Sequence, residues 1–446
     1  MEHTLKITKV IAGGKGLGTL ADGMVMMVGG VLPGETVTAR ETKAHRGHKE
    51  GALVRIVEAA PERVTPPCPH YGLCGGCDLQ HASYPAQLAI KGQILRESLL
   101  RARLTLPADQ PGPALPSPEA FHYRHRVRLH LDQSGQLGFH QSGSNAVVPI
   151  RRCLLATEPI NRVMAALADG GWPERLSEQI AAIELIHSPA DDRVVLVLQP
   201  RPSVPNPLAA GLLAEMVNQA NPAPLADSVF LQTEQPGRGR ANGSAESTQA
   251  AESATLAQNF VVQGHAYQLR WDHRGFFQVN ALQNPRMIEM ALDLLSPHAK
   301  PCTALDLFCG MGNFSIPLGL CGAQVTGVEH NRMSIHWAER NGRAAGLAQA
   351  RFIAAGVEQQ LQILVERKAR FDCILLDPPR QGLGKAAALL PQLAPERIVS
   401  ISCDPATHAR DLALITQAGY RLTRISAVDM FPQTHHIESV ALLERN

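Results

Sequence analysis

The chain has 446 residues, of which 45% are hydrophobic and 18% charged, and its formal net charge at pH 7 is +2. A chain of this length buries enough apolar surface for two or three domains without stabilising disulfides. The charge balance excludes a uniformly basic nucleic-acid binder, and no apolar run reaches the roughly 18 residues that a membrane-spanning helix needs. The first residues lack the apolar core of a signal peptide, so we expect a cytoplasmic protein with reduced cysteines and no membrane partner.

Residues 1–62 carry short apolar runs separated by glycine-rich turns, which is typical of a small β-barrel. The run Gly13-Gly14-Lys15-Gly16-Leu17-Gly18 lacks the spacing of a phosphate-binding loop, so we interpret it as a β-turn. A basic loop follows at residues 43–49. A solvated hairpin tip and an RNA-backbone contact both remain possible readings of it.

Three cysteines, Cys68, Cys74 and Cys77, lie close together in a glycine-rich loop. Glycines let the backbone fold tightly, so several thiolates can converge on one metal centre. Cys153 is the remaining cysteine before position 302 and is therefore the candidate for a fourth ligand. By ligand type, an iron-sulfur cluster and a zinc ion are both open.

Residues 121–130 alternate in a way that predicts a β-strand, with Arg124, Arg126 and Arg128 on the same face. Three arginines beside aromatic residues favour RNA over a merely solvated face. Residues 236–258 are rich in Gly, Ser, Ala and Gln, and we expect a mobile surface insertion there. We assign residues 63–268 to a central α+β domain that contains this insertion.

From about residue 269 onward, apolar strands alternate with helical segments, which predicts a doubly wound, Rossmann-like α/β domain over residues 269–446. The strand at 303–308 leads into a glycine turn at 309–313, and the next strand ends in Glu329, which could accept both ribose hydroxyls of a nucleoside cofactor. Two further strands end at Asp377 and at Cys403. Ligands collect at this edge of open α/β sheets, so Cys403 is a candidate nucleophile there.

Several motifs together are recognisable: Phe277-Gln278-Val279-Asn280, Asp377-Pro378-Pro379-Arg380-Gln381-Gly382, Ser402-Cys403-Asp404-Pro405-Ala406-Thr407 and Phe431-Pro432-Gln433-Thr434-His435-His436-Ile437-Glu438. In this order they resemble the RNA (uracil-5)-methyltransferase family. The front half resembles the branch that acts on 23S ribosomal RNA, which carries an N-terminal TRAM barrel of OB-like fold and a four-iron, four-sulfur cluster. The similarity spans nearly the whole chain apart from residues 236–258.

The resemblance implies a reaction and a set of site residues. Cys403 would add to carbon 6 of a uridine, S-adenosylmethionine would supply the methyl group for carbon 5, and Glu438 would act as general base. It also implies that Cys68, Cys74, Cys77 and Cys153 hold the 4Fe-4S cluster. The residues implied for the S-adenosylmethionine site are Gln278, Phe308, Asn313, Glu329 and Asp377.

Three positions depart from the family pattern: Ser400 stands where tyrosine is usual, Asp404 where asparagine is usual, and Gly356 where a polar cofactor contact is usual. A carboxylate beside the thiol is expected to raise its pKa. Two alternatives to a ribosomal RNA methyltransferase therefore remain open. One is a transfer RNA uracil-5-methyltransferase, and the other is an RNA-binding assembly factor with a decayed methyltransferase site.

Overall fold

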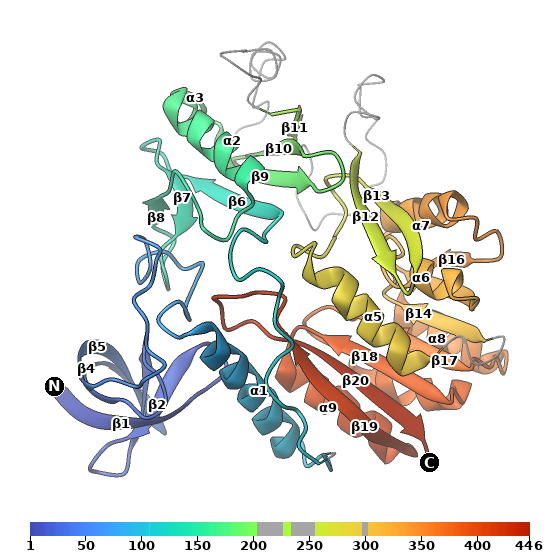
Figure 1. Cartoon of the computed structure of the whole chain (residues 1–446), viewed down its shortest axis with the longest axis horizontal. Helices are drawn as coiled ribbons and strands as arrows, with labels where there is room; N and C mark the ends of the chain where they lie inside the picture. The colour runs from blue at the N-terminus through green and yellow to red at the C-terminus, as the bar shows by residue number, and fades with distance from the viewer. Residues whose placement is uncertain (107, 203–225, 233–254, 297–301) are drawn as a thin grey trace.

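The computed structural model describes residues 1–106, 108–202, 226–232, 255–296 and 302–446 (Figure 1). Figure 1 shows a barrel at the N-terminus, a sheet with two helices above it, and a large α/β unit that ends at the C-terminus. Among the described helices, none combines the length and the apolar character that crossing a bilayer requires.

The N-terminal residues form the predicted barrel. Its five strands close in the order β1-β2-β3-β5-β4, and alternate side chains such as Leu5, Ile7, Met26 and Val28 fill its interior because successive residues of a strand point to opposite faces. The strands are β1 (Glu2–Val10), β2 (Lys15–Thr19), β3 (Val25–Gly29), β4 (Thr36–Ala44) and β5 (His48–Glu58).

A six-stranded sheet follows, in the order β11-β10-β9-β6-β7-β8. Its strands are β6 (Arg126–Leu131), β7 (Leu137–His140), β8 (Val147–Pro149), β9 (Ile180–Ser188), β10 (Arg193–Pro200) and β11 (Ser228–Leu231). Helices α2 (Glu158–Asp169) and α3 (Trp172–Leu176) pack on it. The predicted arginine strand is shorter than expected, since it begins at Arg126 and not at residue 121.

Most of the predicted insertion at 236–258 lies outside the described residues. Its last part was assigned wrongly, because β12 (Leu256–Val262) begins there and pairs with β13 (His265–Trp271) over seven residues. Leu256 and Phe260 are buried against the large α/β unit. Local composition concealed this strand, which pairs with the next strand and also packs against helix α5.

The large unit is the predicted doubly wound sheet, with seven strands in the order β16-β15-β14-β17-β18-β20-β19. The first five are parallel, and β20 runs antiparallel to both of its neighbours. The strands are β14 (Thr303–Leu307), β15 (Gln324–Glu329), β16 (Arg351–Ala354), β17 (Cys373–Leu376), β18 (Arg397–Ser402), β19 (Tyr420–Val428) and β20 (Glu438–Arg445).

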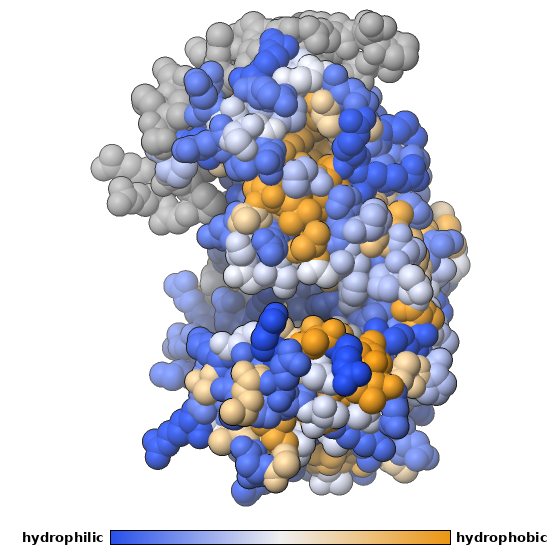
Figure 2. Space-filling view, turned by 90° about the vertical axis from the view of Figure 1, so that its left-hand side faces the viewer, coloured by the Kyte–Doolittle hydropathy of each residue, from blue (hydrophilic) through white to orange (hydrophobic). Residues whose placement is uncertain are grey.

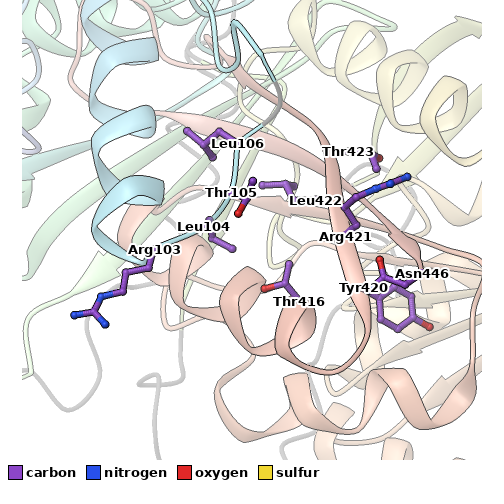
Figure 3. A pocket seen from close by; sticks show the side chains of 10 residues that line it. All are labelled: Arg103, Leu104, Thr105, Leu106, Thr416, Tyr420, Arg421, Leu422, Thr423 and Asn446. Carbon is purple, nitrogen blue, oxygen red and sulfur yellow. The ribbon is translucent and has the colours of Figure 1, made fainter.

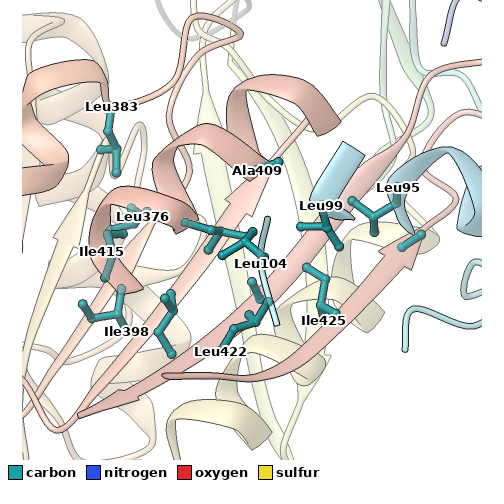
Figure 4. Close-up of a cluster of buried hydrophobic side chains, with 14 of the residues drawn as sticks. Leu95, Leu99, Leu104, Leu376, Leu383, Ile398, Ala409, Ile415, Leu422 and Ile425 are labelled. Atoms are coloured by element: carbon teal, nitrogen blue, oxygen red, sulfur yellow. The ribbon is translucent and has the colours of Figure 1, made fainter. Parts of the chain in front are cut away.

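Each face of this sheet has its own buried core. On one face, Leu376, Ile398 and Ile425 pack among helices that include α1 (Tyr84–Arg101), α8 (Val357–Glu366) and α9 (Pro405–Gln417) (Figure 4). On the other face, Leu375 and Val399 pack with α5 (Gln283–Leu295), α6 (Ser315–Leu320) and α7 (Arg332–Ala344). Neighbouring residues of one strand thus enter opposite cores, as a sheet covered on both sides requires.

The division of the chain at 62/63 and 268/269 stays a prediction. Two structural facts bear on it: α1 packs against α9 and β19 of the large sheet, and β13 runs across residues 268 and 269. Helix α1, although early in the sequence, is thus part of the packing around the large sheet.

A buried ion pair fixes α1 to the C-terminal part of the chain. Lys91 Nζ lies 2.5 Å from Asp429 Oδ1, and neither side chain has exposed surface. Tyr84 donates a hydrogen bond to Asp429 Oδ2 at 2.9 Å, and Lys91 also donates to the Phe431 carbonyl at 3.0 Å. Both charges therefore have several polar partners, which is the condition under which a buried pair is tolerated.

Replacing one member of this pair should destabilise the protein strongly. We expect Lys91→Met to lower the free energy of unfolding by about 3–5 kcal/mol, because Asp429 would be left buried without a counter-charge. Calorimetric melting of the full chain measures this loss. Arg101→Ala, which breaks an ion pair whose arginine is 71% exposed, should cost less than about 1 kcal/mol. Equal effects of the two variants would contradict the assignment.

Candidate active site and cysteine centre

Polar side chains gather where the parallel strands of the large sheet end. Glu329 is the last residue of β15, Asp377 follows β17, and Cys403 follows β18. Glu438 is the first residue of β20. Because β20 is antiparallel to β18 and Ser402 pairs with Ser439, Glu438 begins at the same edge, next to the cysteine. The four groups therefore share one edge.

Cys403 is partly exposed and lies among acidic groups. Burial raises the pKa of its thiol to about 11, with further contributions from Glu438 and Asp377, while Arg380 lowers it. The free protein thus keeps this sulfur mainly as a thiol near neutral pH.

The expected effect of Asp404 on this thiol needs correction. Its carboxylate caps helix α9, accepting hydrogen bonds from the backbone amides of Ala406 and Thr407 at 3.0 and 2.8 Å. The carboxyl groups that act most on the pKa of Cys403 are Glu438 and Asp377. Asp404 has a structural role that asparagine would fill equally well, since both are favoured at this helix position.

The other two departures also have local explanations. Ser400 bonds through its hydroxyl to Nε2 of the buried His408 at 3.0 Å, and Nδ1 of that ring bonds to Ser439 at 2.7 Å. A small polar residue at 400 therefore joins β18, α9 and β20. Gly356 is the cap residue just before helix α8, and a Cβ added there would meet open space, so the position leaves room for a ligand.

Glu438 and Asp377 are both buried carboxyl groups. Glu438 is 4% exposed, and its Oε2 atom has no hydrogen-bond partner among the described residues. Burial, helped by Asp377, raises the pKa of Glu438 well above its usual range. Burial likewise raises the pKa of Asp377, which accepts a hydrogen bond from Gln278 Nε2 at 3.3 Å. A cationic ligand at this edge would favour the ionised forms of these carboxyl groups.

The turn after β14 brings the remaining predicted residues to this edge. Phe308 has φ +63°, a left-handed conformation that non-glycine residues rarely adopt. Asn313 is not a helix cap, since the cap position of α6 is Phe314. Its side-chain amide instead exchanges two hydrogen bonds with Asn284, at 2.8 and 3.1 Å. Glu329 accepts a hydrogen bond from the Asn331 amide at 2.8 Å.

Two residues near this turn were missed as site residues. Asn284 orients Asn313 from helix α5. Asp306 has no exposed surface, receives a hydrogen bond from Ser315 Oγ at 2.5 Å and has a second oxygen without a partner among the described residues. Burial raises the pKa of Asp306 to about 7. A carboxylate inside an apolar strand was the available signal for Asp306, whereas nothing local indicated Asn284.

The cysteine centre is built separately, against the six-stranded sheet. Cys68, Cys74, Cys77 and Cys153 all line a pocket of about 210 Å³. Burial, together with the three other thiols, raises the pKa of Cys77 to about 12. The structure therefore brings together the four cysteines that were selected from the sequence.

The four thiols supply a donor set that a zinc ion and an iron-sulfur cluster can both use. No three of the Sγ atoms lie within 4.8 Å of one another. A single zinc ion with bonds of about 2.3 Å would hold its sulfur ligands roughly 3.8 Å apart. A polynuclear iron-sulfur cluster holds its thiolates farther apart than that.

The three arginines proposed for RNA binding lie in different environments. Arg126 forms a two-pronged ion pair with Glu184, at 2.8 Å for each contact, and donates to the Gly275 carbonyl at 3.0 Å. Arg124 lines the cysteine pocket and donates to the carbonyl of residue 126 at 3.1 Å. Of the three, Arg128 is exposed and the other two are half-buried. Arg126 joins β6 to β9 and to the 275 loop.

A cavity of about 540 Å³ lies elsewhere, lined by Leu104, Tyr420, Arg421 and other residues (Figure 3). Strand β19 runs parallel to β18, since both are antiparallel to β20. The first residues of β19 therefore lie at the opposite edge of the sheet from Cys403. This cavity is distinct from the candidate active site.

Comparisons with known proteins agree with this geometry. Residues 238–446 match the family model tRNA (Uracil-5-)-methyltransferase. The chain is 35% identical to the 23S rRNA (uracil(1939)-C(5))-methyltransferase RlmD of Shewanella amazonensis, over 95% of this chain and 91% of that protein. It is 34% identical to the protein of the same name from Pseudomonas putida, over 99% of this chain and 94% of that one.

A solved structure shares the fold over nearly the whole chain. The tRNA (uracil-54, C5)-methyltransferase of Pyrococcus abyssi, in complex with S-adenosyl-L-homocysteine, superposes with a TM-score of 0.73. The match covers 98% of this chain and all of that one at 22% identity. With relatives of such identity along almost its full length, the chain belongs to the S-adenosylmethionine-dependent RNA (uracil-5)-methyltransferase family.

Proposed function

We propose that this protein transfers a methyl group from S-adenosylmethionine to carbon 5 of a uridine in 23S ribosomal RNA. The observation that carries the proposal is the meeting of Cys403 and Glu438 at one sheet edge, through the pairing of β18 with β20. The relatives named above are 23S rRNA enzymes that act on uracil 1939, and we propose the same target base.

The chemistry assigned to the two residues is complementary. Carbon 5 of uracil is a weak nucleophile, and the Cys403 thiolate activates it by adding to carbon 6. S-adenosylmethionine supplies an electrophilic methyl group to carbon 5 when it is bound. Glu438 then takes the proton from carbon 5, so that the carbon–sulfur bond breaks and the thiolate leaves.

The raised pKa values fit a site that becomes active when a cation enters it. In the free protein, burial favours the protonated forms of Glu438 and Asp377. A positive charge nearby lowers the pKa of a carboxyl group, so Glu438 can then act as a base. We assign cofactor contacts to Asp377 and to four further residues: Gln278, Phe308, Asn313 and Glu329.

We further propose that residues 63–268 form an iron-sulfur domain in which Cys68, Cys74, Cys77 and Cys153 bind a 4Fe-4S cluster. Bonds to one cluster would tie the loop at 68–77 to the segment that contains Cys153. A role in holding this domain together follows from that crosslink. In the same scheme, residues 1–62 are a TRAM-like RNA-binding barrel and residues 269–446 the methyltransferase domain.

The RNA path is proposed from shape and exposure. Figure 2 shows a hollow that crosses the face made by the barrel and the six-stranded sheet, with apolar surface on both sides of it. Apolar and aromatic surface suits unstacked bases, while basic groups such as Arg128 and the loop at 43–49 suit the phosphate backbone. Arg124 is assigned to the same surface, whereas the ion pair with Glu184 gives Arg126 a structural role.

The domain layout by itself does not select the RNA. The Pyrococcus abyssi protein that shares the fold over the full length is a tRNA enzyme, so the fold is compatible with either RNA. Sequence identity to the 23S rRNA enzymes is the observation that favours ribosomal RNA.

A trapped covalent complex tests the function. Fluorine at carbon 5 cannot be removed as a proton, so the protein, S-adenosylmethionine and a 23S rRNA fragment with 5-fluorouridine at position 1939 should accumulate a methylated adduct. Intact-protein mass spectrometry detects it, and Cys403→Ala should give none. A fluorinated transfer RNA is the competing substrate. Adduct with transfer RNA alone would reassign the substrate, and RNA binding without any adduct would favour a decayed enzyme.

The reactivity of Cys403 should follow its raised pKa. Because the thiolate is the reactive form, the rate of alkylation by iodoacetamide should rise about tenfold per pH unit from pH 7 to 10 in the free protein. Peptide mass spectrometry follows Cys403 alone. Asp404→Asn should leave this profile unchanged, since asparagine keeps the helix cap. A midpoint near 8 in the wild type would argue against the acidic environment described above.

Metal analysis tests the cluster. Anaerobically purified protein should contain about four iron and four sulfide ions per chain. Cys153→Ala should lower both contents. Cys321→Ala, at a buried cysteine outside the pocket, should retain them. Stoichiometric zinc in place of iron would overturn the assignment.

A further inference from the structure

The segment between β19 and β20 ends on Glu438, and parts of the chain that are remote in sequence hold it in place. We call residues 429–437 the base loop. Lys91 and Tyr84 of helix α1 bind Asp429 at its start. Tyr123 donates a hydrogen bond to the Pro432 carbonyl at 3.1 Å.

The cysteine centre also contacts the base loop directly. Asp78 and Leu79 follow Cys77 in the chain, and their backbone amides donate to the Gln433 carbonyl at 3.2 and 3.0 Å. Gln433 has φ +70°, a left-handed conformation. The Asp78 carboxylate also forms a hydrogen bond with His435 Nδ1. Three contacts thus join residues next to a proposed cluster ligand to residues just before the proposed base.

Gly14 of the barrel packs against the contact between Asp78 and His435. Gly14 has φ +75°, and a Cβ placed on it would lie 3.1 Å from Cγ of Asp78 and 3.3 Å from Cβ of His435. Both the backbone conformation and the short separations therefore call for glycine. The glycine-rich turn of the barrel, which we did not interpret as a phosphate loop, has a packing role instead.

We propose that Asp78 and His435, covered by Gly14, are positioning residues that set the location of Glu438 from the cysteine centre and the barrel. The proposal deepens the proposed function and rests on it. Neither side chain is assigned a contact with the reacting atoms. His435 acts through the two residues that separate it from Glu438, and Asp78 acts through His435 and the Gln433 carbonyl.

This arrangement predicts a defect in one chemical step. Formation of the Cys403–carbon 6 bond and transfer of the methyl group to carbon 5 need the nucleophile, which lies between β18 and α9 and is supported by the Asp404 cap. Removal of the carbon 5 proton, which re-forms the carbon 5–carbon 6 double bond and expels the thiolate, needs Glu438. A displaced base loop should slow the second step and spare the first.

The experiment compares two substrates. With 5-fluorouridine RNA, adduct formation reports bond formation and methyl transfer without the base. With ordinary uridine RNA, turnover also requires proton removal, and a slow base leaves a methylated covalent complex. Glu438→Gln is the reference for complete loss of the base. Asp78→Asn, His435→Gln and Gly14→Ala are the test variants, and iron content and melting temperature are measured for each.

Asp169→Asn is the matched control, because it makes the same chemical change as Asp78→Asn at an exposed site. Asp169 is 59% exposed and pairs with Arg151.

We expect His435→Gln and Asp78→Asn to accumulate the methylated complex with ordinary RNA and to lose turnover by about tenfold or more. Their rate of adduct formation with 5-fluorouridine RNA should stay within about twofold of wild type. Gly14→Ala should show the same pattern more weakly. Asp169→Asn should match wild type with both substrates.

Parallel loss of both rates, or no change in either, would overturn the positioning role. If one variant loses its iron or fails to fold, the remaining two decide between these outcomes, since they alter the contact from different domains. Failure of the proposed function is distinguishable, because the wild-type protein itself would then form no adduct with 5-fluorouridine RNA.

Discussion

The ion pair between Lys91 and Asp429 is the contact on which the placement of the base loop against helix α1 depends. Two charges without exposed surface are costly unless their geometry is fixed, so α1 and the start of the base loop have one favourable placement relative to each other. Helix α1 comes from the region between the cysteine loop and the six-stranded sheet. The pair therefore couples the packing of the front of the chain to the strand that carries Glu438.

The active edge and the cysteine centre are held by different kinds of backbone structure. At the edge, parallel strands end together, and the backbone alone brings Glu329, Asp377 and Cys403 to one line. The cysteine centre is not built on parallel strands. Its thiols converge through a tight loop that the neighbouring sheet supports. The first kind of site tolerates changes in the loops that follow its strands. The second depends on the conformation of its own loop, in which Gly72 has φ +87°.

The sequence allowed prediction where function follows from local pattern. The barrel, the parallel strands and the residues at their ends could be predicted because apolar runs and glycine turns determine them within about ten residues. Glu438 was different: it lies at the beginning of an antiparallel strand, and only the family motif singled it out. The residues around Glu438 do not indicate that β20 pairs with β18.

The errors share a physical cause, which is a specific contact that composition does not reveal. Arg126 looked like a member of a basic face, yet Glu184 neutralises it from the adjacent strand. Residues 256–258 looked like part of a polar insertion, yet they pair with β13 and pack on the methyltransferase core. Asp404 was expected to raise the pKa of the Cys403 thiol, yet its carboxylate caps the helix that follows it. In each case a long-range or backbone contact outweighed composition.

The order of strands in the large sheet also bears on how the protein is made. Strand β20 leaves the ribosome after β18 and β19, yet it lies between them in the finished sheet. Until it is synthesised, β18 and β19 have no hydrogen-bonding partner on their facing sides, and the cores on both faces are incomplete. Sheets assembled from such non-local pairings form slowly, and their strand edges stay unpaired until folding is complete. Assembly of the proposed base is thereby tied to closure of the sheet, so an incompletely synthesised chain holds the nucleophile without the group that would release its product.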